Sequence, residues 1–377
     1  MCDHPEMRVE QALEEYKAAT RSLHFLKRLT PRSITQDRAD LINYAKSGKK
    51  SSLSWVLEPN SDLASERLRT AAARIEQVLP GHAGSLLNLA EGLELAGSEH
   101  KSHEFLEWSE NRYGSPSDDL IRSANSILER DALPERKNIP SNGVFDVFSE
   151  VVTQVLPSRF VVRLDMQSGA KASVSGHTIR VRDQEVFSHD EVLRLVVHEI
   201  GTHAFRRANS DAQQVTELLS SHDSDAWTEE GLAVYNEHHL GVASDNTNRI
   251  YAARAIAAQT AQTNGIFEVL DFLTQHFEPS RAVDIAIRCK RGLVRPTRQG
   301  AFTKDLAYLG GFLAVSQQIE GNCGLWSVLM SAKVALHRLP EMLEAKNRGA
   351  LVSPEYLPST SLVELSTKAL ALGGWRE

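Results

Sequence analysis

The chain has 377 residues, and its 42 lysines and arginines against 49 aspartates and glutamates give a formal net charge of −7. This charge indicates no general attraction to nucleic acid or anionic membranes, and no apolar run approaches the ~20 residues that span a bilayer. The three cysteines form neither a CxxC pair nor a disulfide framework, and the first residues lack the basic and apolar regions of a signal peptide. We therefore expect a soluble cytoplasmic protein that binds neither nucleic acid nor membrane.

The first third of the chain is predicted to be helical. From about residue 7 to residue 130, helix-like segments alternate with breaks at proline and glycine residues. Residues 133–140 are charged and bounded by prolines, which is typical of a linker. We therefore predict an N-terminal helical region over residues 1–138 and a second domain over residues 139–377.

The second domain is predicted to contain a small sheet followed by helices. Residues 159–165 and 172–182 carry β-branched residues or polar–apolar alternation, so both segments are predicted strands. A helix is expected directly afterwards, because Ser188 and Glu191 have the spacing of a capping box and the following apolar residues recur at helical intervals. Further helices are expected over about residues 228–240, 246–262, 281–291 and 303–319. The expected fold class is α+β, mainly α.

The first helix of this domain carries a candidate metal site. It contains His198, Glu199 and His203, and the next predicted helix contains Glu229 and Glu230. Two imidazoles and one carboxylate are the ligand set of a catalytic zinc site, whose fourth position stays open for water. The glutamate beside the first histidine, Glu199, would be the general base. A buried helix also rarely holds an unpaired charge unless a metal or polar cluster needs it.

The spacing of the two histidines makes a specific demand on the backbone. His198 and His203 are five residues apart, and in a regular α-helix that step separates two side chains by roughly 140°, so they could not share one ion. A π-type turn would return them to one face, and Gly201 in the gap most easily absorbs the distortion. We therefore predict a π-bulge between Ile200 and His203. Without it, the segment is a surface helix that happens to carry two histidines.

Several motifs in a fixed order resemble those of one enzyme family. They are HEIGTH at residues 198–203, EGLA at residues 230–233, RCKRG at residues 288–292 and GAFTKDLAYLGG at residues 300–311. They resemble the family of the microtubule-associated tyrosine carboxypeptidases, which also holds bacterial QEGLA-motif (flavohaemoglobin expression-modulating) proteins. The resemblance covers roughly residues 145–320. The chain has Glu229 in place of the first letter of QEGLA, which leaves Glu230 as the family-matched ligand and Glu229 as a competing candidate.

This resemblance implies a fold and an activity. It implies a zincin-like zinc metallopeptidase domain that acts as a carboxypeptidase on a protein or peptide C-terminal tail, releasing tyrosine or another aromatic residue. The Zn²⁺ ligands would be His198, His203 and Glu230. Glu237, farther along the second helix, is expected to be a solvated carboxylate, although it could orient a ligand imidazole.

A carboxypeptidase must also pair the terminal carboxylate of its substrate with a cation. Arginine suits this role because its planar fork binds a carboxylate through two hydrogen bonds. Arg288 and Arg291 lie three residues apart, on one side of a helix if the segment is helical. Lys304 follows Thr303, a predicted N-cap, where a helix N-terminus favours anions. These three cations are the predicted substrate-binding residues, and Tyr308 is predicted to stabilise the oxyanion.

Two other function classes stay open. One is a zinc endopeptidase or amidohydrolase that uses the same metal site on other substrates. The other is a non-catalytic binding or regulatory protein that retains the fold. The presence of Glu199 argues against the second, because a degenerate enzyme would most simply lose its base.

Overall fold

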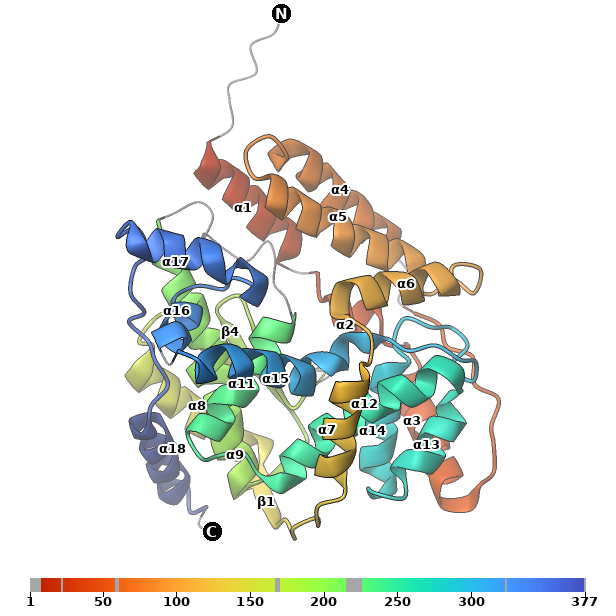
Figure 1. The fold of residues 1–377 in the computed structure, drawn as a ribbon. Helices are drawn as coiled ribbons and strands as arrows, with labels where there is room; N and C mark the ends of the chain where they lie inside the picture. Colours follow the sequence, from red (N-terminus) through yellow and green to blue (C-terminus); the bar gives the residue numbers. More distant parts are fainter. Residues whose placement is uncertain are drawn as a thin grey trace, which may run out of the picture. The chain divides into compact units, whose positions relative to one another are not determined.

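The computed structural model describes residues 8–375, apart from Ser22, residues 58–60, residues 167–169, residues 215–225 and Cys323. The chain forms two compact units: unit 1 comprises residues 1–129 and 250–306, and unit 2 comprises residues 130–249 and 307–377. Helices dominate both units, and unit 2 also contains two small sheets (Figure 1). The expected fold class, α+β and mainly α, is confirmed.

Unit 1 consists of helices. In chain order these are α1 (Val9–Thr20), α2 (Phe25–Arg28), α3 (Ile34–Ser47), α4 (Ser61–Ile75), α5 (Pro80–Leu95), α6 (Ser102–Tyr113), α7 (Asp118–Leu128), α13 (Ile266–Leu273), α14 (Pro279–Cys289) and the 3-10 turn η3 (Thr303–Asp305). Helix α12 (Asp245–Thr263) spans the change of unit at residue 250. In the core of this unit the Phe105 ring stacks on those of Trp108 and Phe302, and Tyr113 meets Trp108 and Phe302 edge-on.

Residues 250–306 group with the N-terminal helices through polar contacts with α3. Tyr44 in α3 donates a hydrogen bond of 2.7 Å to Asp271 in α13, and Arg38 forms an ion pair of 2.7 Å with Asp284 in α14. Nothing in the sequence pattern indicated this grouping, because it depends on side chains more than 200 residues apart. That the catalytic domain begins after residue 138 stays a prediction.

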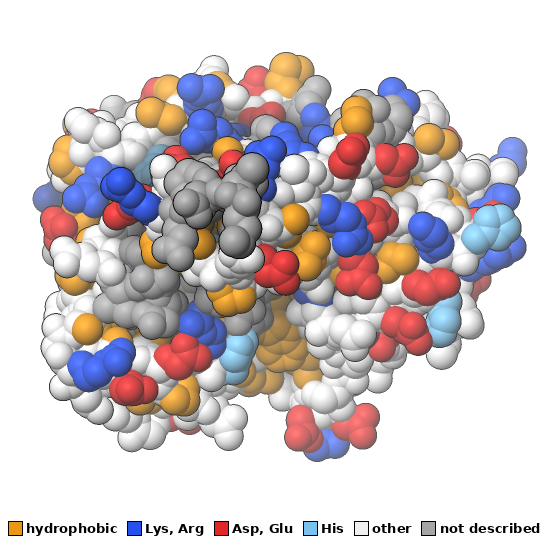
Figure 2. Space-filling model, turned by 90° about the horizontal axis from the view of Figure 1, so that it is seen from above, with side chains coloured by type: hydrophobic (Ala, Val, Ile, Leu, Met, Phe, Trp, Pro, Cys, Tyr) orange, Lys and Arg blue, Asp and Glu red, His pale blue; other side chains and the backbone are white. Residues whose placement is uncertain are grey.

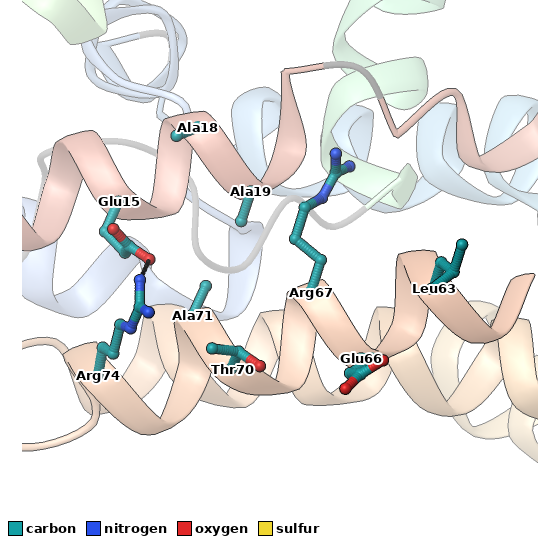
Figure 3. Close-up of a pocket in the computed structure, with 9 residues that line it drawn as sticks. All are labelled: Glu15, Ala18, Ala19, Leu63, Glu66, Arg67, Thr70, Ala71 and Arg74. Carbon is teal, nitrogen blue, oxygen red and sulfur yellow. Dashed lines mark hydrogen bonds and ion pairs between the residues drawn. The ribbon is translucent and has the colours of Figure 1, made fainter. Parts of the chain in front are cut away.

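A groove of about 420 Å³ runs between α1 and α4 within unit 1 (Figure 3). Glu15 of α1 and Arg74 of α4 form an ion pair of 2.9 Å across it, and Ala19 and Ala71 lie between the helices (Figure 3). None of the residues that line the groove belongs to the motifs identified in the sequence.

Unit 2 has two small sheets, and three of their strands fall within the segments predicted as strands. The strands are β1 (Lys137–Pro140), β2 (Val161–Asp165), β3 (Ala172–Ser175), β4 (Thr178–Arg182) and β5 (Val186–Ser188). One sheet has the order β2-β4-β3, with β2 parallel and β3 antiparallel to β4; the other pairs β1 with β5. The prediction of a linker over residues 133–140 is wrong at its end, because Ile139 is fully buried opposite Phe187 in the second sheet.

The remaining elements of unit 2 pack on this β-structure. They are α8 (Ser141–Val155), α9 (His189–Leu195), the π-helix η1 (Val196–Ala204), α10 (Phe205–Asp211), α11 (Ala226–His239), α15 (Leu306–Glu320, its first residue in unit 1), α16 (Gly324–Ser331), the 3-10 turn η4 (Leu336–Arg338), α17 (Leu339–Asn347) and α18 (Thr360–Leu372). Phe148 of α8, Ile179 of β4 and Ile200 of η1 are fully buried in one apolar cluster. This cluster fixes η1 in the centre of the unit.

The surface of the protein mixes charges of both signs. Figure 2 shows acidic and basic side chains intermixed on the face that it displays. Among the described residues, no helix is both long and apolar enough to cross a membrane.

Candidate metal centre

The histidine-bearing helix begins where the sequence predicts. The Ser188 hydroxyl accepts a hydrogen bond of 3.2 Å from the Glu191 backbone, and the Ser188 N–H donates one of 3.3 Å to the Glu191 carboxylate. This reciprocal pair is the predicted capping box. Glu191 is also held by Lys171 of the neighbouring loop at 2.8 Å, so the start of the helix is fixed to the sheet.

The backbone widens through the motif, as predicted. All nine residues from Val196 to Ala204 are π-helical, a longer distortion than the bulge expected between Ile200 and His203. The i→i+5 bonding of a π-helix brings residues five apart onto one face, so His198 and His203 project together. Gly201 has a second reason to be glycine, because a Cβ there would lie 2.8 Å from Leu362 of α18.

Three side chains converge at this point. The ligand atoms of His198, His203 and Glu230 all lie within 4.8 Å of one another. The Glu230 Oε2 atom lies 3.3 Å from His198 Nε2 and 3.9 Å from His203 Nε2. Ligands of a tetrahedral Zn²⁺ at ~2.0–2.2 Å are roughly 3.3–3.6 Å apart, so the donor set and its spacing fit one zinc ion with little movement.

The other ring nitrogen of each histidine faces a second carboxylate. His198 Nδ1 lies 2.7 Å from Glu237 Oε1, and His203 Nδ1 lies 3.3 Å from Glu229 Oε2. Metal-binding imidazoles commonly donate this second N–H to a carboxylate, which fixes the tautomer and the ring orientation. Both Nε2 atoms are thereby directed toward Glu230.

Each outer carboxylate is held in turn by buried cations. Glu237 is fully buried and forms an ion pair of 3.1 Å with Arg194, so the expectation that it is solvated is wrong. Glu229 is bound by Arg206 and, at 2.6 Å, by Lys333. These contacts hold Glu229 at Nδ1 of His203, whereas Glu230 lies on the Nε2 side of the ring. Glu230 is therefore the better placed of the two candidate ligands.

The charges of these groups follow from their partners. Burial raises the pKa of Glu229, but Arg206 and Lys333 outweigh it and hold the pKa well below its usual range. The pKa of Glu237 is likewise raised by burial and lowered overall by Arg194 and His198. Burial lowers the pKa of His198, whereas its bonds to Glu230 and Glu237 raise it well above its usual range. Both outer carboxylates are therefore anionic acceptors.

Glu199 and Tyr308 lie beside the triad. Glu199 is 6% exposed, and its charge is one of the causes that raise the pKa of His198. The Tyr308 ring lies 6.4 Å from the His198 ring, centre to centre, with an angle of 24° between their planes.

Two close helix contacts place Tyr308 and Glu230. A Cβ on Gly231 of α11 would lie 2.2 Å from the backbone of Gly311 in α15, so the two helices touch backbone to backbone. The Trp227 ring packs over Gly310 one turn away. Asn236 of α11 donates a hydrogen bond of 2.9 Å to Thr202 of η1. The glycines of the EGLA and GAFTKDLAYLGG motifs thus have a structural role that the sequence alone did not reveal.

The three predicted substrate-binding cations lie in unit 1. Arg288 donates two hydrogen bonds, of 2.5 and 2.7 Å, to Asp305. Arg291 lies beyond the end of α14 and is buried, so the prediction that it shares a helix face with Arg288 is wrong. Lys304 lies in the 3-10 turn η3, and Thr303 is not its N-cap, because the Thr303 hydroxyl bonds to Ser109 instead.

The glycines of these two motifs are also explained by packing. Gly292 has a φ of +83° and Gly300 a φ of +120°, a region that favours glycine. A Cβ on Gly292 would lie 2.1 Å from the Phe105 ring, and one on Gly300 would lie 2.6 Å from Leu106. Both glycines therefore allow a close approach of α6.

These features define a candidate metal centre of two histidines and a glutamate on adjoining helices, with a buried glutamate beside it. The family model described as microtubule-associated tyrosine carboxypeptidase matches residues 61–371, and the chain belongs to this family. The resemblance found in the motifs is confirmed, and the match reaches beyond the residues 145–320 that carried it. A comparison with curated proteins gives no match.

Proposed function

We propose that the protein is a zinc-dependent carboxypeptidase with a zincin-like catalytic domain. It hydrolyses the C-terminal peptide bond of a protein or peptide and releases tyrosine or another aromatic residue. The observation that carries the proposal is the convergence of His198, His203 and Glu230 within 4.8 Å, on a π-helix that a metal site with this spacing requires. Membership of a carboxypeptidase family supports the reaction type.

The proposed chemistry divides the work between the metal and the glutamate. A zinc ion held by the three side chains would supply a Lewis acid for the scissile carbonyl and for the attacking water. Glu199 would accept a proton from that water as its oxygen bonds to the carbonyl carbon, and would pass the proton to the amine that leaves when the C–N bond breaks. Glu199 is buried next to the ligand His198, so its carboxylate belongs to the same site as the triad.

Tyr308 is proposed to stabilise the oxygen that gains charge during the attack. Its ring lies next to His198, so its phenol belongs to the same part of the site as the triad. A hydrogen bond donated by the phenol to that oxygen would strengthen as the negative charge develops.

Arg288, Arg291 and Lys304 are proposed to provide the positive charge for the terminal carboxylate. Arg288 already binds the Asp305 carboxylate through both oxygens, the geometry with which an arginine binds a C-terminus. Arg288 would bind the substrate carboxylate through the same fork, and Arg291 and Lys304 would add positive charge.

The test compares peptides that end in a free tyrosine with the same peptides amidated at the C-terminus. We expect tyrosine to be released from the free acid only. Peptides that end in a small residue should lose that residue more slowly. Arg291→Ala and Lys304→Ala should weaken the preference for the free acid. Arg295→Ala is the matched control, because Arg295 is a half-exposed cation of the same segment, paired with Glu99 at 3.2 Å.

Cleavage of both peptides at the same rate, or cleavage at internal bonds, would move the protein to the endopeptidase class. Absence of hydrolysis from a zinc-loaded protein across a library of peptide ends would favour a non-catalytic binding protein.

A further inference from the structure

We propose that Glu229 is a positioning residue for the metal ligand His203, and that Arg206 and Lys333 hold Glu229 in that role. The inference rests on the proposed metal site, and it concerns residues that bind no metal themselves.

The contacts of Glu229 connect three parts of unit 2. Its Oε2 atom lies 3.3 Å from His203 Nδ1 and 2.6 Å from Lys333 Nζ, and its Oε1 atom is bound by Arg206. The side chain of Glu229 is only 13% exposed, and that of Arg206 is fully buried. A carboxylate with two cations in such a place has a fixed position, because every alternative leaves a buried charge without compensation.

Arg206 is itself immobilised by the backbone after α16. Its guanidinium donates to the carbonyl oxygens of Leu329 at 3.0 Å, Ala332 at 2.8 Å and Val334 at 3.1 Å. Lys333 belongs to the same stretch, so residues 329–334 contribute both the anchors of Arg206 and the second cation. The position of His203 is therefore set by a segment distant in the sequence.

The chemistry of the imidazole explains what this arrangement achieves. A neutral histidine has one N–H, and it binds a metal through the other nitrogen. An anionic acceptor at Nδ1 keeps the proton there and leaves the Nε2 lone pair for the metal. Arg206 and Lys333 hold both oxygens of Glu229 on the Nδ1 side of His203, away from the metal, which leaves Glu230 as the carboxylate ligand.

The test varies residue 229 in a background from which one of its two cations has been removed. Lys333→Met is the reference background, because it removes one buried cation. In that background, Glu229→Leu removes the acceptor for His203, and Glu229→Gln restores an uncharged acceptor of the same size. Arg206 keeps its three carbonyl partners in all variants. Asp211→Asn is the control, since Asp211 in α10 pairs with Arg207 of the same helix and with His177 of the turn between β3 and β4, and not with the triad.

The readouts are zinc affinity, measured by competition with a chromophoric chelator, and the visible absorption spectrum of the cobalt-loaded protein. We expect Glu229→Leu/Lys333→Met to bind zinc about 10–100-fold more weakly than Lys333→Met, with a changed cobalt spectrum. Glu229→Gln/Lys333→Met should recover most of the affinity, and Asp211→Asn should match the wild type. Circular dichroism verifies that each variant is folded.

Equal zinc affinity and identical cobalt spectra for the Leu and Gln variants would overturn the role of Glu229 while leaving the metal site standing. A wild-type protein that binds no zinc would overturn both this inference and the proposed function. An active zinc enzyme with unequal variants would support both.

Discussion

The Nδ1 atom of His198 lies 2.7 Å from Oε1 of Glu237, a fully buried carboxylate on the neighbouring helix α11. Arg194, one turn before His198, forms an ion pair of 3.1 Å with the same Glu237 oxygen. Because Glu237 is fully buried, these two partners take the place of its hydration. This relationship fixes the first ligand imidazole and links the two motif helices.

The burial of Glu237 predicts a large effect on stability. Glu237→Gln should destabilise the fold by about 3–5 kcal/mol, because it leaves the Arg194 charge buried without an anion. Glu94→Gln is the control; Glu94 binds Arg69 through two hydrogen bonds of 2.7 Å, but this pair is partly exposed to solvent and worth about 0–1 kcal/mol. Urea denaturation measures both. Similar losses in the two variants would show that Glu237 is not effectively buried.

The role of Glu199 predicts a separation of metal binding from turnover. Glu199→Gln should bind zinc as the wild type does, because Glu199 is not among the three converging ligands. Its turnover of a tyrosine-ended peptide should fall about 10²–10⁴-fold, the usual contribution of general acid–base catalysis. Stopped assays of tyrosine release measure this, and turnover near the wild-type rate would reject Glu199 as the base.

The contact between Gly231 and Gly311 predicts a steric effect. Gly231→Ala should destabilise the fold by about 1–3 kcal/mol, because its Cβ would meet backbone at 2.2 Å and backbone cannot rotate away. Gly84→Ala in α5 is the control; a Cβ there has nothing within 4 Å, and it should be neutral or stabilising by about 0.4–1 kcal/mol. Thermal unfolding measures the stability of both variants. A Gly231→Ala variant as stable as the wild type would contradict the close contact of these two helices.

The ion pairs of Asp305 predict that the free energy of unfolding depends on pH. Burial raises its pKa, but Arg288 and Arg254 outweigh it and hold the pKa well below its usual range. Since an unfolded aspartate has a pKa of ~3.9, the unfolded chain binds the proton first as the pH falls. The stabilisation is therefore complete above about pH 4 and is lost progressively below it.

Asp305→Asn should thus lower the free energy of unfolding at pH 7 by about 3–5 kcal/mol, and the difference from the wild type should narrow below pH 4. Urea denaturation between pH 7 and pH 3 measures it. Asp284→Asn, at the half-exposed pair with Arg38, should show a much smaller difference. A difference for Asp305→Asn that is independent of pH would contradict the account.

Local features of the site could be predicted from the sequence. The capping box of Ser188 needs only two residues three apart, and the π-helix follows from requiring His198 and His203 to face one ion. Both predictions depend on geometry within about two turns of helix. The same holds for the strands β2 and β4, whose patterns are local.

Contacts between distant segments could not be predicted. Lys333 and Glu229 are 104 residues apart, and no local pattern indicates that they meet. In the sequence Glu237 resembles a surface carboxylate, and its ion pair with Arg194 becomes evident only in the structure. The ends of elements could not be predicted either: α14 ends at Cys289, and Gly292 beyond it has a positive φ and approaches the Phe105 ring.

The most direct test of the central claim is the zinc content of the purified protein, measured by elemental analysis after dialysis against a weak chelator. The account predicts one zinc per chain in the wild type and in Glu199→Gln, and none in the double variant His198→Ala/His203→Ala. One zinc per chain remaining in the double variant would contradict the claim that these histidines hold the metal.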